Sequence, residues 1–235
     1  MLKAVLFDLD DTLFDHRHSM LTGLTALQNK YECFRRLTLD KFETEHNRLM
    51  NEVNLDGILE GLMTLDEGRA LRFKRAFSTY GVDADETVSY EAAGIYRKNY
   101  VSVSRLVPYA KRLLEELGGN YKIGIVTNNL IDEQVRKLKE NKIDHLIDVM
   151  VTSEEVKTSK PNKKIFEEAL RRLETTAGET LMIGDSWQGD IAGAYNLGMK
   201  CIWMNVYDEK CPDPKMAAEI RSLKEVKGII SDNYK

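Results

Sequence analysis

A short acidic segment near the N-terminus offers the first chemistry in this sequence. It reads Asp8-Leu9-Asp10-Asp11-Thr12 and closes an apolar run that begins at Lys3. Carboxylates can attack phosphorus and form aspartyl-phosphates. The Asp-Asp-Thr run is typical of a turn, so we expect Asp11 to shape the chain there rather than to act as a catalyst.

Polar residues also follow three later apolar runs. Open α/β sheets bind their ligands just beyond the carboxyl ends of their strands, so we expect these residues to converge on one site. Besides Asp8, Asp10 and Thr12 after the first run, they are Thr127, Asn128 and Asn129 after the second, Lys160-Pro161 after the third, and Gly184-Asp185-Ser186 with Asp190 after the fourth.

These residue types suit a metal-assisted reaction at a phosphoryl group. Carboxylates that converge repel one another and require a cation. Oxygen ligands without His or Cys favour Mg²⁺ over Zn²⁺ or Cu²⁺. A lysine ammonium and a threonine hydroxyl beside such a metal would bind phosphoryl oxygens, because phosphoryl transfer depends mainly on positioning and charge neutralisation.

The elements that must position these residues alternate along the chain. This alternation predicts an α/β fold with a Rossmann-like core, in which helices cover both faces of a mainly parallel sheet. The expected strands lie at residues 3–9, 122–127, 147–153, 180–184 and 200–205, and the helices between them at residues 109–117, 131–141, 163–173 and 191–197.

One region interrupts the alternation. Residues 15–101 have helical patterns, turn signals at residues 54–57, 61 and 81–83, and no strand signal. We expect an all-helical domain at residues 15–101, inserted into a core made of residues 1–14 and 102–235. The alternative is a separate N-terminal helical domain, but a lone strand at residues 3–9 needs its sheet.

Composition limits the partners and the compartment. The formal net charge of the 235 residues is -4, so we expect no nucleic acid and no membrane as partner, and local positive groups or a metal must hold an anionic substrate. Cysteines in no metal-binding spacing and the lack of a signal segment favour the cytoplasm. The oligomeric state stays open between monomer and homodimer. We expect three histidines on the solvated surface: His16, His18 and His46.

The motifs, in their order, resemble those of the haloacid dehalogenase (HAD) superfamily of hydrolases. Each follows a predicted strand, and together they span essentially the whole chain. The resemblance implies a Mg²⁺-dependent phosphoric monoester hydrolase that acts on a small phosphorylated metabolite. The matching segments are Asp8-Leu9-Asp10-Asp11-Thr12 for the first motif, Thr127-Asn128 for the second, Lys160-Pro161 for the third, and Gly184-Asp185-Ser186 with Asp190 for the fourth.

The resemblance also implies catalytic roles. Asp8 would attack phosphorus, and Asp10 would protonate the leaving oxygen and then activate water. Thr127 and Lys160 would hold the phosphoryl oxygens. Asn128 would contact the substrate or serve only as a turn residue.

The implied metal site uses the same strand ends. Mg²⁺ would lie between the carboxylates of Asp8 and Asp185 and the main-chain carbonyl of Asp10. Three residues would support the site around these groups: Thr12, Ser186 and Asp190.

Within the superfamily, the inserted helices resemble a helical cap of type 1, whose inner face sets the choice of substrate. Residues 47–50, 69–73 and 198–205 are similar to the branch of pyrimidine nucleotidases and the acylneuraminate phosphatase. Asn47 and Arg72 are therefore candidate cap residues for substrate binding, against the alternative of surface or salt-bridge roles. The implied substrate is a nucleotide monophosphate or a sugar phosphate, which includes a 5'-nucleotidase activity.

Three other functions fit the same fold. A phosphomutase would keep the acids and return the phosphoryl group to a sugar, a difference that lies in the cap. A 2-haloacid dehalogenase would attack carbon and needs neither a metal nor Asp10. A non-catalytic binding module would be expected to lose Asp8 or Lys160, and both are present.

Overall fold

A computed structural model describes residues 1–52 and 63–233 of the chain. The chain divides into two compact units, which we name the core unit (Met1–Asp15 with Arg105–Lys235) and the helical unit (His16–Ser104). The turns predicted at residues 54–57 and 61 lie outside the described residues.

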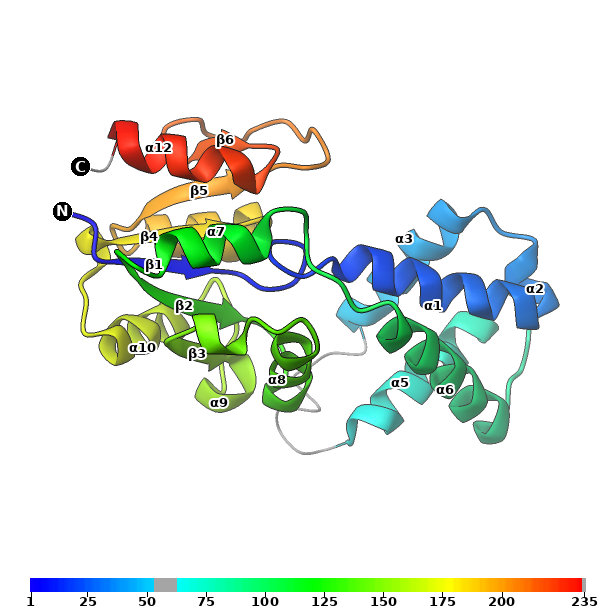
Figure 1. The fold of residues 1–235 in the computed structure, drawn as a ribbon. Helices are drawn as coiled ribbons and strands as arrows, with labels where there is room; N and C mark the ends of the chain where they lie inside the picture. Colours follow the sequence, from blue (N-terminus) through cyan, green and yellow to red (C-terminus); the bar gives the residue numbers. More distant parts are fainter. Residues whose placement is uncertain (53–62, 234–235) are drawn as a thin grey trace. The chain divides into compact units, whose positions relative to one another are not determined.

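The core unit contains one six-stranded sheet, and every pair of neighbouring strands is parallel (Figure 1). The strand order is β3-β2-β1-β4-β5-β6. The predicted α/β class with a Rossmann-like parallel sheet is therefore confirmed. The strands are β1 (Ala4–Phe7), β2 (Lys122–Thr127), β3 (Val149–Thr152), β4 (Thr180–Gly184), β5 (Lys200–Met204) and β6 (Ala218–Ile220).

Strand β1 lies inside the sheet between β2 and β4. In this register Phe7 stands beside Ile125 and Ile183. All the strands run in the same direction, so the residues that follow them meet at one edge of the sheet. This edge is where the predicted site residues belong.

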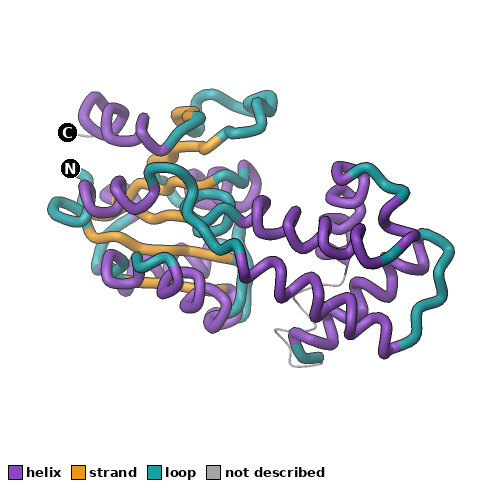
Figure 2. The backbone as a smooth tube through the Cα atoms, turned by 45° about the vertical axis from the view of Figure 1, so that its right-hand side comes forward, coloured by secondary structure: helices purple, strands orange, loops and turns teal. Residues whose placement is uncertain are grey.

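Helices bury both faces of the sheet. Leu6 packs in one cluster with Phe166 on one face, while Val5 and Phe7, which alternate with it along β1, are fully buried on the other. Figure 2 shows the strands flanked by helical segments. The helices of the core unit are α7 (Ala110–Leu117), α8 (Ile131–Glu140), α9 (Ser153–Val156), α10 (Lys163–Leu173), α11 (Gly193–Tyr195) and α12 (Val226–Asn233).

Among its described residues the helical unit contains helices and no strand. The ring of Phe34 stacks on Phe42 with centroids 4.6 Å apart and lies 4.7 Å from Phe77, so aromatic side chains hold the helices together. Nowhere in residues 1–52 and 63–233 does a helix have the length and apolar character needed to span a membrane. The helices of this unit are α1 (His16–Lys30), α2 (Glu32–Arg35), α3 (Leu39–Glu52), α5 (Leu65–Thr79) and α6 (Glu86–Ser102).

The prediction for His46 is wrong. Its side chain is buried, and its ring lies 5.9 Å from Phe73 and 5.1 Å from Tyr96, centroid to centroid. Burial lowers the pKa of His46 well below 6.5, with the charge of Arg72 acting in the same direction. The imidazole is therefore neutral and belongs to the aromatic packing of the helical unit.

Candidate active site

Asp8 lies where the chain leaves the sheet. Its amide still donates to the Ile183 carbonyl at 2.9 Å, which continues the β1–β4 pairing by one residue. The amide of Phe14 then donates back to the Leu9 carbonyl at 2.8 Å, so the segment closes into a tight loop. Asp11 has a left-handed φ of 61°, as its predicted role in a turn requires. The loop keeps Asp10 and Thr12 at the same edge of the sheet as Asp8.

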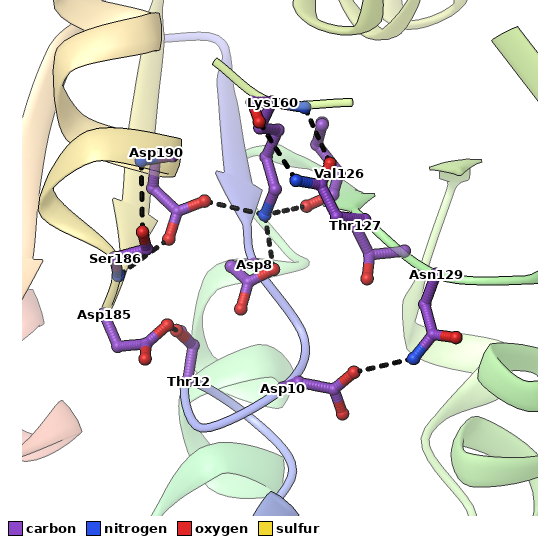
Figure 3. Close-up of polar contacts among 12 residues, drawn as sticks. Asp8, Asp10, Thr12, Val126, Thr127, Asn129, Lys160, Asp185, Ser186 and Asp190 are labelled. Carbon is purple, nitrogen blue, oxygen red and sulfur yellow. Dashed lines mark hydrogen bonds and ion pairs between the residues drawn. The ribbon is translucent and has the colours of Figure 1, made fainter. Parts of the chain in front are cut away.

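Lys160 lies at the centre of the site (Figure 3). Its ammonium is 2.5 Å from Asp8 Oδ1 and 2.6 Å from Asp190 Oδ1, and it donates to the Val126 carbonyl at 2.9 Å. The Lys160 side chain is only 5% exposed. An ammonium this deeply buried is stable only with such partners, so the lysine and the two acids form one unit.

The side-chain amide of Asn128 fixes the backbone of Lys160. Asn128 Oδ1 accepts from the Lys160 amide at 2.6 Å, and Asn128 Nδ2 donates to the Lys160 carbonyl at 3.0 Å. The peptide bond from Lys160 to Pro161 is cis. Asn128 was predicted as a substrate contact or a turn residue, and the structure shows its amide joining the second motif to the third.

Three carboxylates lie close enough to share one metal ion. Asp8, Asp185 and Asp190 each offer an oxygen, and these oxygens lie within 4.8 Å of one another. The group holds three buried or half-buried acids and one ammonium, that of Lys160, which pairs with two of them, so it has an excess of negative charge and only oxygen ligands. Both properties fit a hard divalent cation such as Mg²⁺. The Asp10 carboxylate is not part of this group, and the ligand expected from Asp10 is its main-chain carbonyl.

Burial raises the pKa values of two of these carboxyl groups, those of Asp8 and Asp185. Desolvation raises the pKa of Asp8 to about 7, with Asp190 and Asp10 adding to the rise and Lys160 opposing it. Desolvation also raises the pKa of Asp185 well above 3.8, helped by the charges of Asp8 and Asp190. The raised pKa values indicate that Lys160 alone does not neutralise the three carboxylates when they are ionised, and a bound cation would supply the missing positive charge.

The fourth motif requires its glycine. A Cβ atom on Gly184 would lie 2.3 Å from Asp190 Oδ2, so only glycine lets the Asp190 carboxylate approach the strand end. Asp190 Oδ2 accepts from the Ser186 amide at 3.0 Å, and Ser186 Oγ accepts from the Gly189 amide at 3.0 Å. Thr12 donates to Asp185 Oδ1 at 3.4 Å. Asp190 thus belongs to the acid group itself, and Thr12 and Ser186 contact two of its members, Asp185 and Asp190.

The carboxylate of Asp10 is turned away from Asp8 and towards Asn129 (Figure 3). It accepts from Asn129 Nδ2 at 3.2 Å and from Gln134 Nε2 at 3.0 Å, and it forms an ion pair with Lys137 Nζ at 2.5 Å. Gln134 Nε2 also donates to Thr127 Oγ1 at 2.6 Å.

Sequence reasoning missed both Gln134 and Lys137. The only available signal was their spacing of three residues in a helix that starts just after the second motif.

The two cap candidates lie in the helical unit. Arg72 on α5 is half-buried, with its guanidinium 5.2 Å from the centre of the Phe73 ring and 5.4 Å from that of Tyr96. Burial lowers the pKa of Arg72. Asn47 is exposed on α3. Their predicted contact with substrate stays a prediction.

Comparison with known proteins gives matches over most of the chain. Residues 5–204 match the family described as haloacid dehalogenase-like hydrolase. A glyceraldehyde 3-phosphate phosphatase of Methanothermobacter thermautotrophicus is 32% identical over 211 residues, which cover 87% of this chain and 86% of that protein. The pyrimidine 5'-nucleotidase YjjG of Escherichia coli is 38% identical over 108 residues, 46% of this chain and 48% of its own.

A solved structure is similar over almost the full length. The crystal structure of YfnB from Bacillus subtilis bound to magnesium superposes with a TM-score of 0.77 at 27% sequence identity. The match covers 98% of this chain and 99% of that one.

Proposed function

We propose that this chain, which belongs to the haloacid dehalogenase-like hydrolase family, is a magnesium-dependent phosphatase that acts on a small phosphomonoester through an aspartyl-phosphate. The observation that carries the proposal is the position of Asp8. It is a buried carboxylate at a strand end, held by Lys160 at 2.5 Å and grouped with Asp185 and Asp190. This arrangement provides a nucleophile, a cation for phosphoryl oxygens and a set of oxygen ligands for Mg²⁺.

In the first step an oxygen of Asp8 forms a bond to phosphorus as the bond from phosphorus to the leaving oxygen breaks. Asp10 gives a proton to that oxygen, so the product alcohol leaves neutral. Lys160 and Thr127 hold the phosphoryl oxygens. Mg²⁺, when bound by Asp8, Asp185 and the Asp10 carbonyl, would supply positive charge next to the transferring group.

In the second step water attacks phosphorus and gives a proton to Asp10. The bond between phosphorus and Asp8 breaks, and inorganic phosphate leaves with the original carboxylate restored. The need for this proton transfer explains why a second acid belongs in the site. A 2-haloacid dehalogenase has no use for it, so Asp10 favours the phosphatase.

The substrate belongs to the small phosphorylated metabolites. Relatives are named for glyceraldehyde 3-phosphate and for pyrimidine nucleotides, so a sugar phosphate and a nucleotide monophosphate are the first classes to test. Arg72 and Asn47 are the proposed cap residues for the part of the substrate that does not react. The cytoplasmic location stays a prediction.

A substrate panel tests the proposal. Release of inorganic phosphate is measured for sugar phosphates, nucleotide monophosphates and small phospho-acids, with Mg²⁺ and with EDTA. We expect turnover that needs Mg²⁺ and that the Asp8→Asn variant abolishes. Full activity in Asp8→Asn would refute the aspartyl-phosphate. Transfer of the phosphoryl group to sugar would identify a phosphomutase, and turnover of halogenated acids in EDTA a dehalogenase.

A further inference from the structure

Lys137 is a buried lysine whose position the proposed reaction does not explain. Its side chain is 2% exposed, and its ammonium lies 5.0 Å from the centre of the Phe14 ring. Burying an ammonium costs free energy unless a partner compensates. The carboxylate of Asp10, 2.5 Å away, is that partner. The Asp10 side chain is about one fifth exposed, so this ion pair connects a buried ammonium to a carboxylate that solvent can reach.

Gln134 lies one helical turn before Lys137 on α8 and holds two groups at once. Its Nε2 donates to Asp10 Oδ2 at 3.0 Å and to Thr127 Oγ1 at 2.6 Å. The ionised carboxylate of Asp10, the form that pairs with the Lys137 ammonium, can only accept, so the amide nitrogen, and not the amide oxygen, faces it. Thr127 Oγ1 then accepts from Gln134, which leaves the hydroxyl hydrogen of Thr127 free to point at a phosphoryl oxygen.

Each oxygen of Asp10 therefore has a fixed donor. Oδ1 is paired with Lys137, and Oδ2 accepts from Gln134 and from Asn129. Gln134 and Lys137 belong to one rigid element, α8, which begins immediately after the loop that follows Thr127. A carboxylate held from both oxygens loses little rotational freedom when it reacts, which is how preorganised groups accelerate proton transfer.

We infer that Gln134 and Lys137 are positioning residues, which hold the Asp10 carboxylate and the Thr127 hydroxyl in the orientations that the reaction uses. The inference rests on the proposed function for its catalytic consequence and on the contacts of α8 for its structural part. It assigns no chemistry to Lys137 itself, because its ammonium is occupied by Asp10.

The test compares two esters that differ in their need for Asp10. The leaving group of p-nitrophenyl phosphate departs without a proton, whereas that of ribose 5-phosphate needs one. We expect Lys137→Met to lower kcat/KM for ribose 5-phosphate by about 100-fold and for p-nitrophenyl phosphate by less than about 10-fold, because kcat/KM reports the step that forms the aspartyl-phosphate, in which only ribose 5-phosphate needs a general acid. Lys137→Arg should recover part of the difference.

A matched control and a mutant cycle separate positioning from simple loss of folding. Lys139 is exposed on the same helix, so Lys139→Met should match the wild type with both esters. In an Asp10→Asn background Lys137→Met should change neither rate further, since it acts through Asp10. Equal losses with both esters, or undiminished losses in the Asp10→Asn background, would overturn the inference.

Urea unfolding gives a readout that does not need activity. If Lys137 holds Asp10, the midpoint shifts of Lys137→Met and Asp10→Asn should be non-additive in the double variant. Additive shifts would overturn the inference. If the wild type released phosphate from no ester of the substrate panel, the proposed function would fail, and this unfolding cycle would still decide whether Lys137 holds Asp10.

Discussion

Replacing Asp8, the proposed nucleophile, by Asn should stabilise the metal-free protein at neutral and alkaline pH. The pKa of Asp8 is raised from 3.8 to about 7, first by burial and then by the charges of Asp190 and Asp10. Between these two values the folded protein binds a proton that the unfolded chain has released. The contribution of Asp8 to the free energy of unfolding of the wild type should therefore fall as the pH rises from about 4 to about 7.

The size of this effect follows from the two pKa values. The difference between 3.8 and about 7 corresponds to at most about 4 kcal/mol of stability lost above pH 7. Asp8→Asn removes this loss of stability. It also removes one of the two carboxylates that pair with Lys160, which lowers the stability of the variant. We therefore expect a net gain of about 1–3 kcal/mol for the variant at pH 8 and no gain at pH 4.

Urea unfolding in EDTA measures this difference. Trp187 and Trp203 lie 5.0 Å apart, centroid to centroid, in the core unit, so tryptophan fluorescence follows the part of the molecule that contains Asp8. Subtracting the free energy of unfolding of the variant from that of the wild type at each pH removes the contribution of acids far from Asp8, and the difference reports Asp8 together with the acids coupled to it. Added Mg²⁺ should narrow the gap, since it stabilises the wild type more than the variant. A variant no more stable than the wild type at pH 8 would refute the reasoning.

Three further results are expected. Binding of Mg²⁺ at pH 7 should release a fraction of a proton per site, because the cation favours the ionised form of Asp8. Calorimetry in buffers of different ionisation enthalpy measures the number of protons released. No release would contradict the claim that Mg²⁺ binds to the group of Asp8, Asp185 and Asp190. Gly184→Ala should lower kcat by about 100-fold, since its Cβ would displace the Asp190 carboxylate; phosphate release measures this, and a wild-type rate would show that the carboxylate can move freely. Phe166→Ala should lower the free energy of unfolding by about 3–5 kcal/mol, because the Phe166 ring is fully buried against the sheet. Urea unfolding measures this change. Tyr195 is exposed, so Tyr195→Ala is a control variant whose free energy of unfolding should change little.

The sequence predicts the strands of this fold well where they have at least four residues, at least half of them buried. The five expected strands are found in order, because each is a short apolar run with turn signals around it. Strand β6 has only three residues, too few for a period to be visible. The helix expected at residues 191–197 is replaced by a π-helical segment at Trp187–Ala192 followed by a single turn, Gly193–Tyr195. The predicted family and the predicted class of enzyme are confirmed.

The candidate site also contains residues that the sequence predicts and residues that it does not. Residues at strand ends were predictable, since parallel strands bring distant polar residues to one edge. Gln134 and Lys137 were not, because a lysine in the last turn of an amphipathic helix is normally a solvated partner of the helix dipole. Only the packing of α8 against Phe14 and Asp10 turns this lysine inward. The burial of His46 was missed for a similar reason, since neighbouring aromatic residues are supplied by other helices.

The charges of the site explain why we propose that its acids bind a cation in addition to a lysine. Asp8, Asp185 and Asp190 place three carboxylates around one ammonium, that of Lys160, which leaves two negative charges in excess when all three are ionised. A phosphomonoester dianion would be repelled by such a group. A divalent cation cancels the excess, and the substrate then meets a neutral site with positive charge directed at its oxygens. Without the cation, the proton that Asp8 retains up to about pH 7 supplies part of the missing charge. The raised pKa of Asp8, the proposed nucleophile, and the proposed need for a metal therefore have the same origin, the surplus of buried carboxylates.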